Sequence, residues 1–314
     1  MTHALSREDV EQAARRIAGH VHRTPLMRSD ALDAACGTEV FVKCENLQKV
    51  GAFKARGATN ALFTLSDDEL ARGVATHSSG NHGAALAYAA GRRGVPAHVV
   101  MPKGAPAVKV RAVQGYGASV HRCDNTLAAR ESALAGLVET GGQRVVHPYD
   151  DPLVVAGQGT IALELLDDLP ELRTMLAPVG GGGLISGLVL GAAGRAEVIG
   201  AEPRSVDDAA RSMTSGKHQP APMGHTIADG LRTRLGGIGF DVLRNNKTRI
   251  WTVDEDEILR AMRFVWERMK LVIEPSAAVP VAALMNPDNH VEGPAAIVLS
   301  GGNVDLDGFF DTLR

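Results

Sequence analysis

Short β-rich segments alternate with alanine-rich helical segments along most of this 314-residue chain. The predicted strands cover residues 39–44, 73–78, 97–102, 118–122, 144–148, 174–179, 197–202, 248–253 and 295–300. Helices are predicted near residues 54–65, 81–93, 106–114 and 125–140. Such alternation is typical of α/β folds, in which helices cover parallel sheets. About nine strands could form one sheet, but two sheets in two lobes suit a chain of this length better.

The composition predicts a soluble globular protein that binds a small molecule. Hydrophobic residues make up 45% of the chain, charged residues make up 22%, and the net charge is −3. Because the two signs are interspersed, we expect no nucleic-acid groove and no anionic membrane surface. The three cysteines form no CxxC pair, which favours a reducing, cytoplasmic location. The amino-terminal segment reads as a capped helix from Ser6, so we expect neither a signal peptide nor a membrane span.

Four consecutive glycines, Gly180–Gly183, lie between an apolar strand and a helix. Bare backbone at the start of a helix lets several N–H groups converge on one anion, so this turn predicts a phosphate site. A nucleotide P-loop would require GK[ST], which is absent here. A dinucleotide turn fits partly, because a GxGxxS pattern ends at Ser186 and Glu202 follows at a strand end. The third candidate is a phosphorylated cofactor such as pyridoxal phosphate, whose aldehyde needs an amine.

Lys54 is the candidate amine. It follows a predicted strand, opens a predicted helix, and lies among small or apolar residues that include Phe53 and Gly57. Most lysines are solvated surface charges, but a partly desolvated lysine has a lowered pKa and can form a Schiff base. Lys54 therefore fits a cofactor that carries both a phosphate and an aldehyde.

Two further polar segments end predicted strands. In HSSGNHG (77–83), the side chains of Ser78, Ser79, Asn81 and His82 gather at the amino terminus of a helix. This group suits a substrate carboxylate, although simple helix capping would need only one such residue. In LSGGNVD (299–305), Ser300 lies at the tip of the last predicted strand.

These segments together resemble the fold-type II pyridoxal-phosphate enzymes, specifically the serine/threonine dehydratase and serine racemase family. The resemblance covers nearly the whole chain in the family's order, through GAFKARGA, SSGNHG, AGQGTIALELL, PVGGGGLISG, AEPRSVDD, TIADGL, WERMKLVIEPSAA and VLSGGNVD. It implies a two-lobed α/β fold like that of the tryptophan synthase β subunit. The large cofactor-binding domain would comprise residues 1–70 and 149–314, and the small domain residues 71–148. A homodimer is expected from the family.

The resemblance also implies roles for the residues around the cofactor. Lys54 would hold the aldehyde of pyridoxal 5′-phosphate and later remove the α-proton of the substrate. Gly180, Gly181, Gly182 and Gly183 would hold the phosphate, and Phe53 would pack on the ring. Asn81 would bond the 3-hydroxyl oxygen, and Ser78, Asn81 and His82 would face the substrate carboxylate.

Ser300 would meet the pyridine nitrogen. A serine hydroxyl leaves that nitrogen largely neutral, which discourages transamination and suits elimination. Ser79 matches the serine that passes a proton on the opposite face of the substrate in serine racemases. Dehydratases also carry a serine there, so Ser79 does not distinguish the two activities.

A divalent cation site is implied by AEPRSVDD (201–208). Glu202, the carbonyl group of Val206 and Asp208 match the family's magnesium or calcium ligands, and manganese is a further candidate. The alternative is that these acids only offset the dipole of the next helix.

We therefore expect a pyridoxal-phosphate-dependent dehydratase that converts small L-β-hydroxy amino acids to a 2-oxo acid and ammonia. Serine, threonine and threo-3-hydroxyaspartate all remain candidate substrates, because Tyr149 replaces an asparagine that binds the substrate in some serine racemases. Serine racemase activity is the nearest alternative. A non-catalytic ligand-binding relative and a nicotinamide dehydrogenase are more distant ones.

Overall fold

The computed structural model describes residues 5–78, 80–220 and 224–306, which form two sheets. The six-stranded sheet has the order β1 (Leu26–Arg28), β2 (Val40–Lys43), β10 (Ala295–Val298), β7 (Thr174–Pro178), β8 (Glu197–Pro203), β9 (Arg249–Val253). The four-stranded sheet has the order β5 (Ser119–Cys123), β4 (Ala97–Pro102), β3 (Val74–His77), β6 (Arg144–Val145). The β1–β2 pair is antiparallel, and the other described pairs are parallel.

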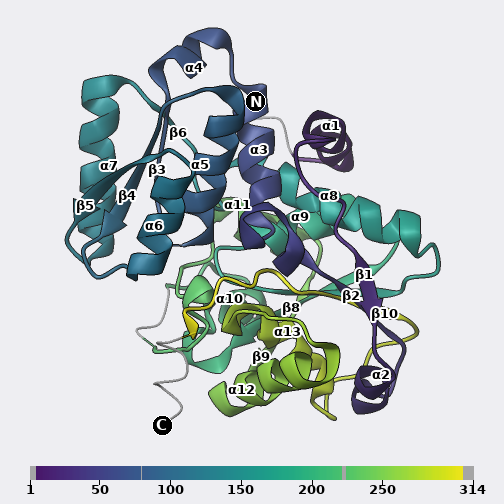
Figure 1. Ribbon diagram of the computed structural model, residues 1–314. Helices are drawn as coiled ribbons and strands as arrows, with labels where there is room; N and C mark the ends of the chain where they lie inside the picture. Colours follow the sequence, from purple (N-terminus) through teal and green to yellow (C-terminus); the bar gives the residue numbers. More distant parts are fainter. Residues whose placement is uncertain (1–4, 79, 221–223, 307–314) are drawn as a thin grey trace.

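Helices cover both sheets (Figure 1). The α-helices are α1 (Arg7–Ile17), α2 (Asp30–Cys36), α3 (Lys54–Thr64), α4 (Asp67–Arg72), α5 (Asn81–Arg93), α6 (Ala107–Gly115), α7 (Leu127–Gly141), α8 (Pro152–Asp168), α9 (Gly183–Ala192), α10 (Asp208–Ser215), α11 (Gly237–Asn245), α12 (Glu255–Phe264) and α13 (Pro275–Met285). Short 3-10 turns cover Glu45–Leu47, Lys49–Gly51, Arg204–Val206 and Asp229–Leu231, and a π-helical turn covers Val265–Met269.

The large sheet is buried on both faces, as its parallel strands require. Side chains alternate along a strand, so Leu176 of β7 packs on one face with α12 and α13. Its neighbours Met175 and Ala177 pack on the other face with α8, α9 and α11. The four-stranded sheet has its own core, which it shares with α5, α6 and the middle of α3.

Glycines of α8 hold together the two helices that carry the predicted site. A Cβ on Gly157 would lie 2.6 Å from the Cα of Gly57 in α3. A Cβ on Gly159 would lie 2.6 Å from the carbonyl oxygen of Gly187 in α9. Because α3 begins at Lys54 and α9 begins at the glycine turn, this close packing fixes their relative positions.

The α/β fold with two helix-covered sheets is confirmed, and each predicted strand is found. The three-residue strand β1 was not predicted, and it adds one antiparallel edge. Helix α3 packs on the core of the small sheet although it lies outside the predicted small domain; the domain boundaries remain a prediction. None of the helices in the described part of the chain combines the length and apolar character needed to cross a bilayer.

Candidate active site

Lys54 opens α3 and is turned toward the segment before α8. Its Nζ donates a hydrogen bond to the carbonyl oxygen of Pro148 at 2.6 Å and lies 5.0 Å from the centroid of the Phe53 ring. Burial lowers the pKa of Lys54 to about 8, against a smaller opposing effect of the Glu274 carboxylate. Such a lysine carries an appreciable fraction of neutral amine near neutral pH, which is the nucleophilic form.

The glycine turn meets the same segment. Gly182 has a φ of 86°, in the left-handed region that favours glycine. A Cβ on Gly181 would overlap the ring of Tyr149, and a Cβ on Gly183 would lie 3.0 Å from the Tyr149 Cα. Since Tyr149 follows Pro148, Lys54 and the glycine turn converge on two adjacent residues.

Asn81 lies at the junction of the two lobes. Its Nδ2 donates to Oε1 of Glu274 at 2.9 Å, and its Oδ1 accepts from Nδ2 of Asn303 at 3.0 Å. Glu274 is 5% exposed, and burial raises its pKa to about 7. Glu274 was not predicted as a site residue. Two signals were present: Glu274 lies within the segment WERMKLVIEPSAA that carries the family resemblance, and it precedes Pro275 at the start of α13, a pattern that equally fits a helix cap.

Ser300 follows β10 and is tied to the residue before Lys54. Its carbonyl oxygen accepts a hydrogen bond from the backbone N–H of Phe53 at 3.0 Å. Gly301 forms an isolated antiparallel bridge with Ala52, and a Cβ on Gly301 would lie 2.7 Å from Oε1 of Glu274. The structure thus brings Phe53, Ser300 and the Asn81–Glu274 pair together.

The loop before α5 is partly described. Ser78 accepts a hydrogen bond at Oγ from the backbone N–H of Gly80 at 3.3 Å, and Ser79 lies outside the described residues. His82 is buried, and its Nε2 lies 3.0 Å from the carbonyl oxygen of Val146. A carbonyl only accepts, so Nε2 carries the proton and Nδ1 can only accept. Burial, together with the nearby Lys54 ammonium, lowers the pKa of His82 to about 3, so the ring is neutral.

Two further histidines were not predicted. The rings of His77 and His147 are 6.0 Å apart and nearly perpendicular, and His147 makes a similar contact with Tyr149 at 4.6 Å. Burial lowers the pKa of His147 to about 4. The phenol of Tyr149 accepts a hydrogen bond from the Thr233 hydroxyl at 2.9 Å. This series of rings extends from the glycine turn toward the end of β3.

The predicted cation ligands lie at the start of α10. Glu202 and Asp208 are each 1% exposed, and Val206 ends a 3-10 turn between them. The Glu202 carboxylate accepts hydrogen bonds from the backbone N–H groups of Ala209 and Ala210 at 3.2 and 2.9 Å. The Asp208 carboxylate accepts one from Leu235 at 2.8 Å. Burial raises the pKa of both carboxyl groups, that of Glu202 to about 8.

A family model described as "Pyridoxal-phosphate dependent enzyme" matches residues 17–301. The chain belongs to this family. A serine racemase from Dictyostelium discoideum is 46% identical over 98% of this chain and 97% of its own length. A beta-hydroxyaspartate dehydratase from Paracoccus denitrificans is 45% identical over 96% of both chains. The structure of maize serine racemase superposes with a TM-score of 0.96, at 41% identity over 99% of this chain and 97% of that one.

The residues present fit the family's cofactor. The glycine turn offers backbone without side chains at the positive end of α9, which suits a phosphate. Lys54 converges on the same segment with a lowered pKa, which suits an aldehyde. A polar rim lies beside them, formed by the half-buried Asn81 and the buried Glu274 and Ser300.

Proposed function

We propose that this enzyme is a dehydratase that converts small L-β-hydroxy amino acids to a 2-oxo acid and ammonia. The observation that carries the proposal is the convergence of Lys54 Nζ and the glycine turn on Pro148–Tyr149. The 45% identity with a beta-hydroxyaspartate dehydratase over 96% of both chains supports elimination at a β-hydroxyl. The reaction breaks the Cα–H and Cβ–O bonds, and hydrolysis of the product releases ammonia.

Lys54 is proposed as the base that takes the proton from the substrate Cα. Its pKa of about 8 leaves enough neutral amine for this task near neutral pH. When bound, pyridoxal phosphate supplies an electron sink for the pair left at Cα. Gly180–Gly183 would bind the phosphate through backbone N–H groups, while Phe53 and Asn81 would hold the ring.

Ser300 favours elimination over transamination. A hydroxyl at the ring nitrogen does not keep that nitrogen protonated as a carboxylate would, so the electron pair at Cα is less widely delocalised. Loss of the β-hydroxyl then competes well with protonation of the cofactor, the step that would lead to transamination. Ser78, Asn81 and His82 are proposed for the substrate carboxylate. His82 could contribute there only if its tautomer changed, because its Nε2–H already faces Val146.

Racemisation of serine is the second candidate activity. Its support is the 46% identity with the Dictyostelium serine racemase. Ser79 is the proposed proton carrier on the second face of the substrate. A Ser79→Ala variant that still eliminates water but no longer interconverts the isomers would support this activity.

We also infer an Mg²⁺, Ca²⁺ or Mn²⁺ ion between Glu202, Asp208 and the Val206 carbonyl group. Two buried carboxyl groups, with no basic side chain bonded to either in the described part of the chain, form an oxygen-rich site that suits such a cation. A cytoplasmic homodimer is inferred as well. Cys36, Cys44 and Cys123 are free, which fits a reducing compartment.

The test measures both the attachment of the cofactor and the products of the reaction. Purified enzyme should be yellow, and borohydride should attach the cofactor to Lys54, as mass spectrometry of the peptide would reveal. L-Serine, L-threonine and both 3-hydroxyaspartate diastereomers would then be compared for oxo acid and for D-isomer. Lys54→Ala should lose both products. A colourless wild-type protein that cannot be reconstituted would refute the proposal.

A further inference from the structure

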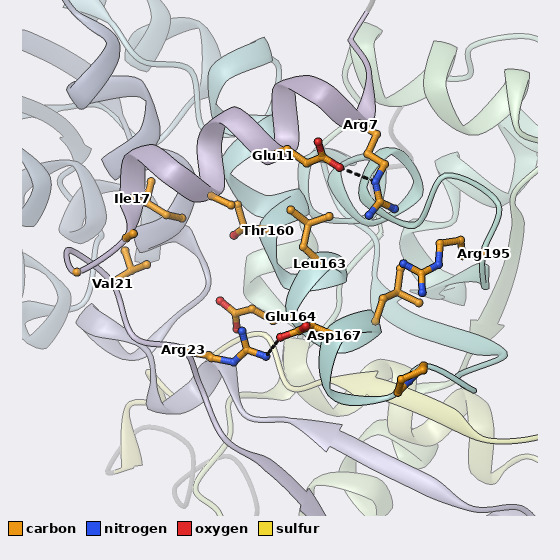
Figure 2. Close-up of a pocket in the computed structure, with 15 residues that line it drawn as sticks. Arg7, Glu11, Ile17, Val21, Arg23, Thr160, Leu163, Glu164, Asp167 and Arg195 are labelled. Carbon is orange, nitrogen blue, oxygen red and sulfur yellow. Dashed lines mark hydrogen bonds and ion pairs between the residues drawn. The ribbon is translucent and has the colours of Figure 1, made fainter.

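A surface groove of about 730 Å³ lies between α1 and α8, lined by residues from both helices and from the turn after α9. Figure 2 shows charged side chains around it, with Leu163 of α8 between them. None of the residues assigned to the active site lines it. Its volume is in the range of small-molecule sites.

The acids that line the groove already have cationic partners within the protein. Glu11 pairs with Arg7 at 2.8 Å, and Asp167 shares Arg23 with Asp168, at 2.8 and 2.5 Å. Glu164 reaches inward to two fully buried cations, Arg56 and Lys43, each at 2.6 Å. These carboxylates are therefore poor partners for a cationic ligand.

Arg195 differs from the other charged residues that line the groove. It is exposed, and its guanidinium has no hydrogen bond or ion pair with any residue that the structure describes. Arg7 donates from NH1 to the carbonyl oxygen of Gly191 at 2.9 Å and from Nε to Glu11. The backbone of Arg195 bonds Ala192, so both arginines lie at the carboxyl end of α9. Figure 2 shows their guanidinium groups at the same end of the groove.

We propose that the groove binds a small organic anion, with its carboxylate or phosphate group between Arg195 and Arg7. An oxyanion accepts charge-assisted hydrogen bonds from guanidinium groups, which present their donors in a planar fork. The apolar part of the ligand would lie against Leu163 and Val21, which also line the groove. This site is separate from the proposed reaction and does not depend on it.

The test uses holoenzyme, because the cofactor then fills the phosphate cradle of the glycine turn. Inorganic phosphate and butyrate are titrated separately at constant ionic strength, by calorimetry and by the shift in thermal midpoint. The two probes distinguish a phosphate from a carboxylate ligand. Arg195→Gln is the test variant. Arg263→Gln is the matched control, because Arg263 is also exposed and lies on α12.

We expect at least one probe to bind wild type and Arg263→Gln equally, and to bind Arg195→Gln about tenfold more weakly or worse. Arg195→Lys should recover part of the affinity. Binding that is unchanged in Arg195→Gln would place the anion elsewhere, for example in the substrate pocket, and would overturn the proposal. Absence of binding by both probes to wild type would also overturn it. Because Arg195 has no partner among the described residues, its variants should keep the unliganded thermal midpoint.

Discussion

Asn81 donates a hydrogen bond from Nδ2 to the carboxylate of Glu274 at 2.9 Å, across 193 residues of sequence. The bond joins the first residue of α5, which packs on the small sheet, to the residue before α13, which packs on the large one. Glu274 is buried without a bonded basic partner among the described residues, and its pKa is raised to about 7. Its protonation state therefore changes near neutral pH, at the junction of the two lobes.

Glu274 makes stability depend on pH. Burial raises its pKa in the folded protein from 4.5 to about 7, so the folded state holds this proton to a higher pH than the unfolded chain. The contribution is fully present below about pH 4.5 and is lost as the pH rises through about 7. We expect about 3 kcal/mol less unfolding free energy at the upper end of this window. Glu274→Gln should remove this dependence.

Urea unfolding of the cofactor-free protein between about pH 4.5 and 8 would measure this effect. Glu267→Gln is the control, because Glu267 is exposed on the π-helical turn and its carboxylate forms an exposed ion pair with Arg263. It should keep the wild-type slope. An unchanged slope in Glu274→Gln would contradict the assignment.

Lys54 should capture the cofactor aldehyde with a midpoint near pH 8. Burial lowers its pKa to about 8, and only the neutral amine attacks a carbonyl group. The rate of absorbance change on adding pyridoxal phosphate to apoenzyme should rise through this pH. Lys54→Ala should show no such change, while the exposed Lys217→Ala should behave as wild type. A midpoint near 10 would mean that Lys54 is solvated.

The ring of Tyr149 should make any side chain at position 181 destabilising. A Cβ on Gly181 would overlap the tyrosine ring, so Gly181→Ala should cost about 1–3 kcal/mol of stability and weaken cofactor binding. In a Tyr149→Ala background the same change should cost less, because the overlap is gone. Gly136→Ala is the control, since nothing lies within 4 Å of its Cβ position in α7. Additive effects of the two substitutions, measured by urea unfolding, would argue against this contact.

The sequence predicts those parts of the fold and of the candidate site that depend on short local patterns. Strand segments, the glycine turn and Lys54 each carry a short pattern, and the structure places them as elements of one α/β fold. Glu274 lies within the quoted segment WERMKLVIEPSAA, but that local pattern does not reveal its hydrogen bond with Asn81, which begins a distant helix. His147 was missed for the same reason, because its ring contact is with His77, which is distant in sequence. Strand β1 is only three residues long and forms by pairing with β2, so alternation could not reveal it.

Substitution of the buried Arg56 should strongly destabilise the folded protein. It is fully buried two residues after Lys54, and bonds Glu45 at 2.7 and 2.9 Å and Glu164 at 2.6 and 2.9 Å. Arg56→Met would leave Glu45 without an ion-paired partner among the described residues and Glu164 paired with Lys43, which should cost about 3–5 kcal/mol. Arg263→Met, which removes an exposed partner, should change stability by less than about 1 kcal/mol. Urea unfolding of both variants measures the difference, and equal effects would contradict the role of the buried network.

Removal of the inferred cation should loosen the start of α10. Glu202 and Asp208 are both buried, and without a cation burial and the nearby Asp208 carboxylate oppose the ionised form of Glu202, the form that would bind a cation. A chelator should therefore lower the thermal midpoint of the wild-type holoenzyme, and added Mg²⁺ or Ca²⁺ should restore it. Asp208→Asn removes one ligand and should show little response to chelator, whereas Asp241→Asn, an exposed change on α11, should respond as wild type. If the chelator leaves the wild-type thermal midpoint unchanged, the two acids serve only to accept hydrogen bonds from the backbone N–H groups around them.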